Sequence, residues 1–278
     1  MPELPEVETI KTAIEQQIGL AVIENVVIYN RRLRNYIPED LEQKIIGSTI
    51  VKYDRIAKYI VIYLTNGICL LWHMGMSGKI KLNKTDPLIE KHDHIIIKTS
   101  NGFISYNDPR RFGLFTYHKT IDLKNSPFFS NIGVEPFSAD FNAKYLFSCL
   151  QKRKNAIKTV LLEQKIVTGI GNIYASEILY ESGISPLRPA NMITLRECND
   201  LVNNTRKVLQ KAIKAGGSTL RDYKKPNGDL GYFQNMHCVY NKTGQKCPNC
   251  TCDVNKTGGI TKIVQNGRST FYCERLQK

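Results

Sequence analysis

The sequence predicts an α+β protein with more than one domain, and three observations carry that prediction. Seven short runs rich in β-branched and aromatic residues fill the first 120 positions. After Pro136, apolar residues recur at helical spacing instead. Five of the eight cysteines lie in the last 41 residues, which sets a third segment apart. With 278 residues and 42% hydrophobic side chains, the chain is long enough for about two domains and a real core.

The N-terminal region is expected to begin with an amphipathic helix and to continue as short strands. Apolar residues recur at helical spacing from Val7 to Ile18, and Gly19 ends the segment. Asn66-Gly67 and Asn101-Gly102 separate neighbouring β-rich runs, as hairpin turns do. The pattern favours an antiparallel sandwich or barrel. The expected strands are 22–29, 50–53, 59–64, 68–72, 94–98, 103–106 and 114–117.

The region after Pro136 is expected to be helical. Glycines and prolines separate its apolar segments. Residues 216–235 are rich in glycine and polar residues and predict a long functional loop. The expected helices are 143–149, 156–162, 173–182 and 195–215.

The charge is distributed unevenly along the chain. Lys and Arg number 39 against 25 Asp and Glu, a formal net charge of +14. Residues 1–150 hold 18 basic and 16 acidic side chains, whereas residues 151–278 hold 21 and 9. This favours a near-neutral domain joined to one that binds a polyanion, although a generally basic protein remains the alternative.

The sequence also bears on where the protein works. No apolar run approaches the ~20 residues of a membrane span. The first residues are acidic, where a signal peptide would be basic and apolar. We therefore expect a reducing cytosol, in which the cysteines serve as thiols and metal ligands.

The chain starts Met1-Pro2-Glu3. Removal of Met1 would expose Pro2 as a secondary amine, and an α-amino group has a pKa of about 7.7–8. Such an amine attacks a sugar aldehyde carbon and forms a cationic iminium, which permits elimination at neighbouring carbons. Glu3 and Glu6 lie close enough in sequence to serve as acid and base. The alternative is that these residues only precede a helix.

Cys247 and Cys250 have the spacing of a metal knuckle, in which two thiolates share a tetrahedral Zn²⁺. Cys273 stands where a second pair would begin, but Leu276 occupies the position of its partner and cannot bind a metal. The fourth ligand is left to Cys252, Cys238, His237, water or nothing. The alternative is a metal-free hairpin with ordinary thiols.

Together these segments resemble the formamidopyrimidine-DNA glycosylase family. The matching segments run in order along nearly the whole chain, and the Leu4-Pro5-Glu6 start favours this branch over the endonuclease VIII type. They are PELPEVET at 2–9, RIAKY at 55–59, HMGMSG at 73–78, KHDH at 91–94, NDPRRFG at 107–113, GIGNIYASE at 169–177, GGSTLRDY at 216–223, GYF at 231–233 and GRSTFYC at 267–273.

The resemblance implies three domains. The first, residues 1–135, is a catalytic antiparallel β-sandwich flanked by helices. The second, residues 136–235, is a helix-two-turn-helix DNA-binding domain whose loop covers the lesion. The third, residues 236–278, is a zinc-finger-like β-hairpin with one structural Zn²⁺ on Cys247, Cys250 and Cys273.

The resemblance also implies catalytic roles. Pro2 would attack C1′ of the damaged nucleotide, and Glu3 would protonate the departing base or the opened sugar. Lys58 would contact phosphate and donate a proton in β-elimination. Arg268 would bind the lesion phosphates and act in δ-elimination, which leaves a one-nucleotide gap.

A base inside a duplex is out of reach, so it must be flipped out at a cost of roughly a few kcal/mol. The resemblance implies that Met76, Arg110 and Phe112 fill the vacated space, with Phe112 as a wedge. Core packing is the alternative for Met76 and Phe112, but the neighbouring glycines favour exposed turns. Further DNA contacts are implied at His92, Arg153, Lys154 and Asn172, the last placed just before a helix.

We therefore expect a monomeric base excision repair enzyme of the bacterial cytoplasm, associated with the nucleoid. It would act on damaged double-stranded DNA as a glycosylase for 8-oxoguanine and formamidopyrimidines opposite C, and as an AP lyase. Three alternatives remain open. They are an endonuclease VIII-like enzyme for oxidised pyrimidines, a non-catalytic DNA-binding protein, and a zinc-dependent hydrolase.

Overall fold

The computed structural model describes residues 2–218, 226, 231–251 and 253–278. The chain divides into two compact units. The first contains Met1–Asn131 and Ala212–Gln234, and the second contains Ile132–Lys211 and Asn235–Lys278. Cys252 and the central part of the predicted 216–233 loop lie outside the described residues. The three-domain division of the chain stays a prediction.

The expected N-terminal helix is present as α1 (Leu4–Ile18) and begins three residues earlier than predicted. Pro5 is accommodated in the first turn, where its missing N–H costs nothing. The side chain of Glu6 accepts a hydrogen bond from the backbone N–H of Glu3 at 2.8 Å and completes a capping box. The helix buries its apolar stripe, which includes Ile10, Ile14 and Ile18.

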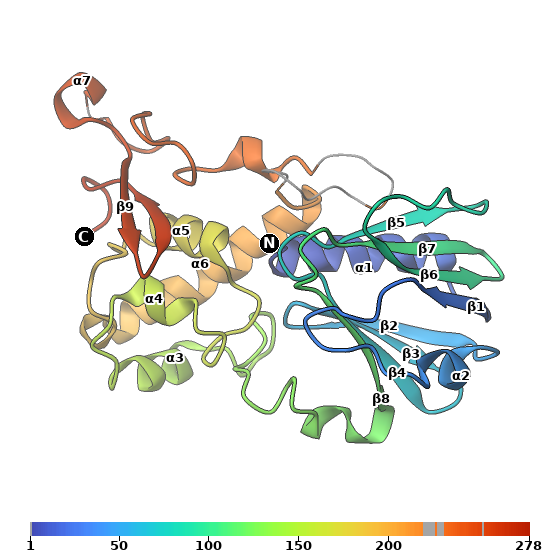
Figure 1. Ribbon diagram of the computed structural model, residues 1–278. Helices are drawn as coiled ribbons and strands as arrows, with labels where there is room; N and C mark the ends of the chain where they lie inside the picture. Colours follow the sequence, from blue (N-terminus) through green and yellow to red (C-terminus); the bar gives the residue numbers. More distant parts are fainter. Residues whose placement is uncertain (1, 219–225, 227–230, 252) are drawn as a thin grey trace. The chain divides into compact units, whose positions relative to one another are not determined.

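Two four-stranded antiparallel sheets follow α1 in the first unit (Figure 1). One has the order β1 (Ile23–Ile28), β6 (Asp93–Thr99), β7 (Gly102–Asn107) and β5 (Lys79–Asn83). The other has the order β2 (Ile50–Ile56), β3 (Tyr59–Leu64), β4 (Ile68–His73) and β8 (Leu114–Lys119). The predicted hairpins β3–β4 and β6–β7 are confirmed, whereas β5 was not predicted.

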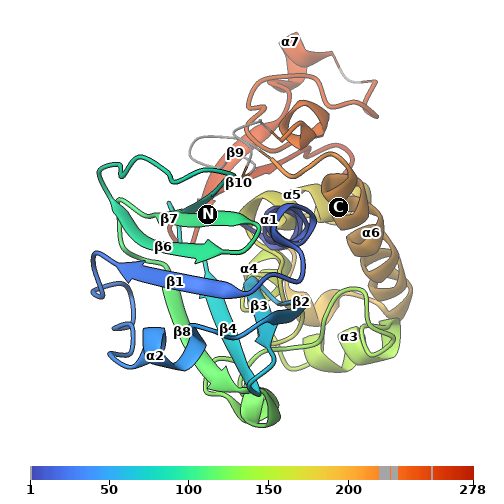
Figure 2. The same cartoon turned by 90° about the vertical axis from the view of Figure 1, so that its right-hand side faces the viewer.

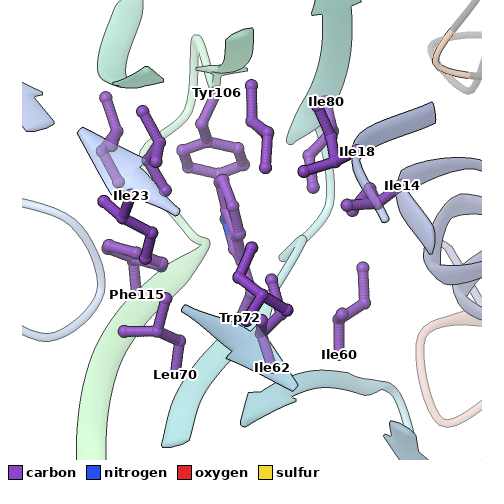
Figure 3. Packing of buried hydrophobic residues seen from close by; sticks show 14 of the residues in the cluster. Ile14, Ile18, Ile23, Ile60, Ile62, Leu70, Trp72, Ile80, Tyr106 and Phe115 are labelled. Carbon is purple, nitrogen blue, oxygen red and sulfur yellow. The ribbon is translucent and has the colours of Figure 1, made fainter. Parts of the chain in front are cut away.

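The core of the first unit lies between the two sheets, which confirms the sandwich (Figure 3). Trp72 from β4 and Tyr106 from β7 meet edge to face with ring centroids 5.3 Å apart. Ile14 and Ile18 of α1 enter the same cluster. Figure 2 looks along α1, which contacts strands of both sheets. Two short helices, α2 (Leu41–Ile45) and η1 (Thr120–Asn125), complete this part.

The second unit is helical, as predicted. It contains α3 (Ala143–Leu150), α4 (Ile157–Leu161), α5 (Asn172–Glu181), η2 (Ala190–Met192) and most of α6 (Leu195–Lys214). Thr194, just before α6, and Glu197, in its first turn, exchange hydrogen bonds, the reciprocal pair that starts many helices. Over the residues with a described structure, no helix has both the length and the apolar character required to cross a membrane.

A C-terminal hairpin completes the second unit. Strands β9 (Thr261–Gln265) and β10 (Arg268–Tyr272) pair antiparallel across Asn266-Gly267. Two short helices, η3 (Phe233–Met236) and α7 (Val254–Thr257), precede them along the chain. Val239, Ile260 and Phe271 form a small apolar cluster beneath the hairpin.

Candidate active site and nucleic-acid interface

Pro2 and Glu3 lie buried at the N-terminal end of α1. Glu3 is only 3% exposed, and Glu6, one turn further on, is 2% exposed. Besides accepting from Glu3, the Glu6 carboxylate accepts the backbone N–H of Ser218 through Oε1 at 2.8 Å. The Glu6 carboxylate therefore connects Glu3, the residue next to Pro2, to Ser218 at the start of the predicted loop. The sequence analysis offered Glu6 as an acid or base, or as an acidic residue at the start of a helix, and did not predict its contact with the loop.

The two described ends of that loop are joined to each other. The backbone N–H of Phe233 donates to the carbonyl of Gly217 at 3.0 Å, and that of Tyr232 to Ala215 at 3.0 Å. Gly217 has φ +77, and a Cβ there would lie 2.9 Å from a Glu6 carboxylate oxygen. Only glycine therefore allows the chain to approach Glu6 this closely. The base of the loop is thus fixed above the N-terminal end of α1.

Lys58 lies immediately before β3, as predicted, but is only 7% exposed and not a solvated strand-end lysine. Close to it is His73, which sequence reasoning did not single out. Burial, followed by the charges of Lys58 and Arg34, lowers the pKa of His73 to about 4. Its imidazole is therefore neutral at pH 7, and Nδ1 accepts the backbone N–H of Gly75 at 3.0 Å. Lys58 and Arg34 thus place two positive charges beside a neutral histidine, and such a pair is suited to binding a phosphate group.

Met76 and Phe112 lie on turns at the ends of strands and not in the core. Phe112 is 46% exposed, and Met76 is half-buried. The guanidinium of Arg110 lies over the ring of Phe112, 4.9 Å from its centroid. The two turns approach so closely that a Cβ on Gly75 would lie 2.4 Å from the backbone of Phe112. The exposed wedge is therefore favoured over core packing.

Asp108 holds these two turns together. It is fully buried, and its Oδ1 accepts from the hydroxyl of Ser77 at 2.6 Å. Its Oδ2 accepts from the backbone N–H of Gly113 at 2.8 Å and from the hydroxyl of Tyr106 at 3.2 Å. The carboxylate thus ties the residue after Met76 to the residue after Phe112. An aspartate before proline gave no signal of this role in the sequence.

His92 lies exposed on the turn before β6 and adopts a left-handed backbone, with φ 74. The amide of Asn107 steadies this turn by donating to the carbonyl of Lys91 at 2.9 Å and to the carboxylate of Asp93 at 2.8 Å. The backbone N–H of Asp108 donates to the carbonyl of His92 at 3.1 Å. Neighbouring residues at the end of β7 therefore position the His92 turn and the Phe112 turn.

In the second unit, α5 begins at Asn172, one residue earlier than predicted, and Gly171 is the N-cap. Oδ1 of Asn172 accepts from Nζ of Lys158 at 2.7 Å, and its Nδ2 donates to the carbonyl of Ser269 at 2.8 Å. Lys158 is 1% exposed and also donates to the hydroxyl of Thr270 at 2.7 Å. This buried lysine, which sequence reasoning missed, joins α4, α5 and β10.

Glu177 is a second buried group that the sequence did not reveal. Its carboxylate accepts three consecutive backbone N–H groups, from Cys238 at 2.6 Å, Val239 at 3.0 Å and Tyr240 at 2.8 Å. Burial raises the pKa of this carboxyl above its ordinary value, and the three donors oppose that rise. The hydrogen bond from the backbone of Tyr240 to Glu177 holds this tyrosine where its hydroxyl lies 3.4 Å from the side-chain amide nitrogen of Asn172.

The remaining predicted DNA contacts are on the surface of the second unit. Arg268 is exposed at the first position of β10. Lys154 is exposed, and Arg153 forms an ion pair with Glu163 at 3.1 Å. All three basic groups belong to the half of the sequence with the large positive charge.

Cys247, Cys250 and Cys273 come together as predicted, with their sulfur atoms within 4.8 Å of one another. The three residues are 2%, 6% and 3% exposed. The pKa of the Cys247 thiol is raised to about 11, and burial is the largest cause. Such a trio of thiols suits a thiophilic divalent ion, which would deprotonate them. Leu276 packs against this cluster and offers no donor.

The group does not extend to Cys238 or His237 among the residues with described positions, and Cys252 lies outside them. The donor set therefore fits three of the four positions of a tetrahedral zinc site.

Two family models match the chain. Residues 1–115 match the formamidopyrimidine-DNA glycosylase N-terminal domain, and residues 132–224 match the formamidopyrimidine-DNA glycosylase H2TH domain. A sandwich with a buried N-terminal Pro-Glu pair, followed by this helical domain, defines a DNA glycosylase of base excision repair.

Similar proteins cover the chain from end to end. Formamidopyrimidine-DNA glycosylases of Rhodospirillum rubrum and Zymomonas mobilis are 44% and 43% identical, each with 100% of both chains covered. A Lactococcus lactis Fpg (MutM) in complex with DNA containing N7-benzyl-Fapy-dG superimposes with a TM-score of 0.90 at 34% identity, again over 100% of both chains. The chain belongs to the formamidopyrimidine-DNA glycosylase family. It is thus a base excision repair glycosylase with AP lyase activity, and its partner is damaged DNA.

Proposed function

We propose that this enzyme removes oxidised purines through a Schiff base on Pro2 and then cuts the DNA on both sides of the abasic site. The observation that carries the proposal is the buried Pro2-Glu3 pair at the start of α1, held by Glu6 beneath the base of the loop. Removal of Met1 makes Pro2 the amino terminus. Its secondary amine then has the low basicity of an α-amino group and is a nucleophile at neutral pH.

The reaction proceeds in three steps. The Pro2 nitrogen bonds to C1′ and loses its proton while the glycosidic bond breaks. The C1′–O4′ bond then breaks, which opens the sugar ring and gives the iminium, and Glu3 supplies the proton that the departing base or O4′ takes up. The resulting iminium acidifies C2′, and loss of a C2′ proton expels the 3′ phosphate. A second elimination removes the C4′ proton and expels the 5′ phosphate, and hydrolysis of the iminium by water then frees Pro2.

Lys58 and Arg268 serve the two eliminations. Lys58, beside neutral His73, contacts a phosphate near the lesion and donates a proton in β-elimination. Arg268, exposed on the hairpin, binds the lesion phosphates and acts in δ-elimination. Asn172, whose amide is oriented by Lys158, contacts the DNA backbone. Further contacts to DNA come from His92, Arg153 and Lys154.

Three residues compensate for the flipped nucleotide. Phe112 enters the stack as a wedge, Met76 fills the vacated space, and Arg110 donates to the orphaned cytosine. Their support is the fixed geometry of the two turns around Asp108.

The test compares incision of duplexes that carry 8-oxoguanine opposite C with duplexes that carry thymine glycol. Preference for 8-oxoguanine:C supports the proposal, whereas preference for thymine glycol supports an oxidised-pyrimidine enzyme. The second candidate has one specific observation in its favour, since a Lactococcus lactis Fpg has been crystallised with DNA containing an oxidised pyrimidine. An otherwise identical protein with an uncleaved N-terminal extension is the control, because it lacks a free Pro2 and should lose both activities.

We also propose that one Zn²⁺ binds Cys247, Cys250 and Cys273 and supports the hairpin without entering the chemistry. Zinc when bound supplies only a link between the thiolates. Metal analysis of the purified protein and of a Cys252→Ser variant tests this. About one zinc per chain in both supports a three-thiolate site, loss of zinc only in the variant assigns Cys252 as the fourth ligand, and no zinc in either contradicts the proposal.

The protein is further proposed to be a monomer in the cytoplasm of a bacterium. Sedimentation of the free protein at several concentrations checks the first point, since a mass near 31.7 kDa at every concentration is expected.

A further inference from the structure

The C-terminal end of β10 is fastened to the segment that follows α5. Gln277 is 3% exposed, and both ends of its amide have partners. Its Oε1 accepts the backbone N–H of Cys273 at 2.8 Å, and its Nε2 donates to the carbonyl of Ile184 at 2.9 Å. A buried amide that satisfies a backbone group on each side is specific in direction as well as in distance.

Neighbouring residues of the same segment receive further contacts. The backbone N–H of Lys278 donates to the carbonyl of Gly183 at 3.0 Å, and Ser185 donates back to the carbonyl of Lys278 at 2.9 Å. From β9, the side-chain amide of Gln265 donates to the carbonyl of Pro186 at 3.1 Å. Four consecutive residues, 183–186, thus each bond to the hairpin or to the chain end that follows it.

The opposite end of β10 is fastened to the opposite end of α5. There Asn172 donates to the carbonyl of Ser269, and Lys158 bonds to both Ser269 and Thr270. The strand that begins with Arg268 is therefore held near its start by Asn172 of α5 and Lys158 of α4, and near its end by the residues that follow α5. None of these hydrogen bonds passes through a thiol.

We infer that Gln277 is a positioning residue that sets Arg268 on its hairpin against α5, and that this docking does not depend on a metal. The inference rests on the proposed role of Arg268 in δ-elimination. Leu276 supports it, because the position of a fourth ligand is taken by an apolar side chain that packs against the cluster containing Cys247, Cys250 and Cys273. A metal, when bound, would be held by the three thiolates, while the hydrogen bonds to 183–186 place the strand.

The test uses the full-length protein with Gln277→Met, which keeps the size of the side chain and removes both hydrogen bonds. Gln245→Met, at an exposed glutamine of the same finger, is the matched control. Abasic DNA is the substrate, and the products of β-elimination and β,δ-elimination are separated on a gel. We expect the ratio of β to β,δ product to rise roughly tenfold in Gln277→Met only, because small misplacements of a reacting group slow a step strongly.

Two further readouts separate positioning from general damage. Borohydride trapping should stay within about twofold of the wild type, because Pro2 is not displaced. Hydrogen exchange should accelerate in the β9–β10 amides of Gln277→Met, but not after removal of metal with a chelator. An unchanged product ratio in Gln277→Met would overturn the inference, as would an equal rise of the ratio after metal removal.

If Gln277→Met does not fold, Gln277→Glu replaces it. The glutamate keeps an acceptor for Cys273 but places a carboxylate oxygen, instead of a donor, against the carbonyl of Ile184, so a rise of the same ratio is expected. A wild-type ratio in a folded Gln277→Glu protein contradicts the inference. Failure of the wild type itself to form a borohydride adduct contradicts the proposed function and not the docking, which the exchange experiment still tests.

Discussion

Nζ of Lys158 lies 2.7 Å from Oδ1 of Asn172, and this contact determines which way the asparagine amide faces. Since a lysine ammonium can only donate, Oδ1 must be the atom that faces it. Nδ2 then faces the carbonyl of Ser269 and the hydroxyl of Tyr240. The donor side of the amide is thereby directed by a residue that does not need to touch DNA.

Replacing Lys158 with methionine should weaken DNA binding through Asn172. The change leaves the Asn172 carbonyl without its charged partner and frees the amide to turn. Loss of one or two such hydrogen bonds corresponds to an affinity about tenfold lower. Fluorescence anisotropy with a duplex carrying a stable abasic analogue measures this. Lys144→Met, at an exposed lysine of α3, should bind within about twofold of the wild type; equal losses in both variants would show a charge effect only.

Phe112→Ala should impair catalysis without destabilising the protein. The ring is 46% exposed, so little core packing is lost, but the wedge that accompanies base flipping is removed. We expect slow excision from 8-oxoguanine duplexes and nearly normal cleavage of abasic DNA, where the damaged base is already gone.

Phe115→Ala is the contrasting variant, because Phe115 is fully buried against Trp72. It should lower the free energy of unfolding by about 3–5 kcal/mol. If Phe112→Ala lowers the thermal unfolding temperature as much as Phe115→Ala does, the wedge assignment is wrong.

His73 should remain neutral throughout the physiological pH range. Its folded pKa of about 4 lies below its ordinary value of 6.5, so its neutral form stabilises the fold above about pH 6.5. That stability is lost as the pH falls towards 4, at about 1.4 kcal/mol per pH unit for one histidine. His237, whose pKa is also lowered to about 4 by burial, should behave in the same way.

NMR titration of the histidine ring protons measures this directly, and His73→Gln and His237→Gln assign the signals. Two rings that do not titrate between pH 5.5 and 8 are expected. Titration of the His73 ring near pH 6.5 would mean that it is not buried beside Lys58 and Arg34.

Glu177→Gln should disturb the site around Tyr240. A carboxylate accepts all three backbone N–H groups, whereas a glutamine offers one oxygen and places an NH₂ group against the remaining donors. Buried donors left without partners cost about 1–3 kcal/mol each. Denaturant unfolding should show this loss, and DNA affinity should fall with it. Glu181→Gln, four residues further along the chain, is the control, and a similar loss there would argue against a specific role for Glu177.

Local sequence patterns were sufficient for most of the fold and for the exposed parts of the site. Helical spacing located α1, and Asn-Gly pairs located two hairpins, because both depend on neighbouring residues. The short edge strand β5 was missed, since its pairing with β7 involves a distant segment. Met76 and Phe112 were correctly expected on turns because glycines flank them.

The buried polar groups could not be found in this way. Lys158, Glu177 and Asp108 each connect segments far apart in sequence, and nothing beside them in the chain shows it. A lysine in an apolar run and an aspartate before proline look ordinary until their partners are placed around them. Gln277 is a similar case, because its partner Ile184 lies 93 residues away.

The identity of the residue that becomes bound to DNA tests the central claim most directly. Borohydride reduction during reaction with an 8-oxoguanine:C duplex, followed by proteolysis and mass spectrometry, identifies that residue. The account predicts one adduct, on the nitrogen of Pro2 in a chain that has lost Met1. An adduct on Lys58 or another lysine, or strand cleavage by active protein without any adduct, would contradict it.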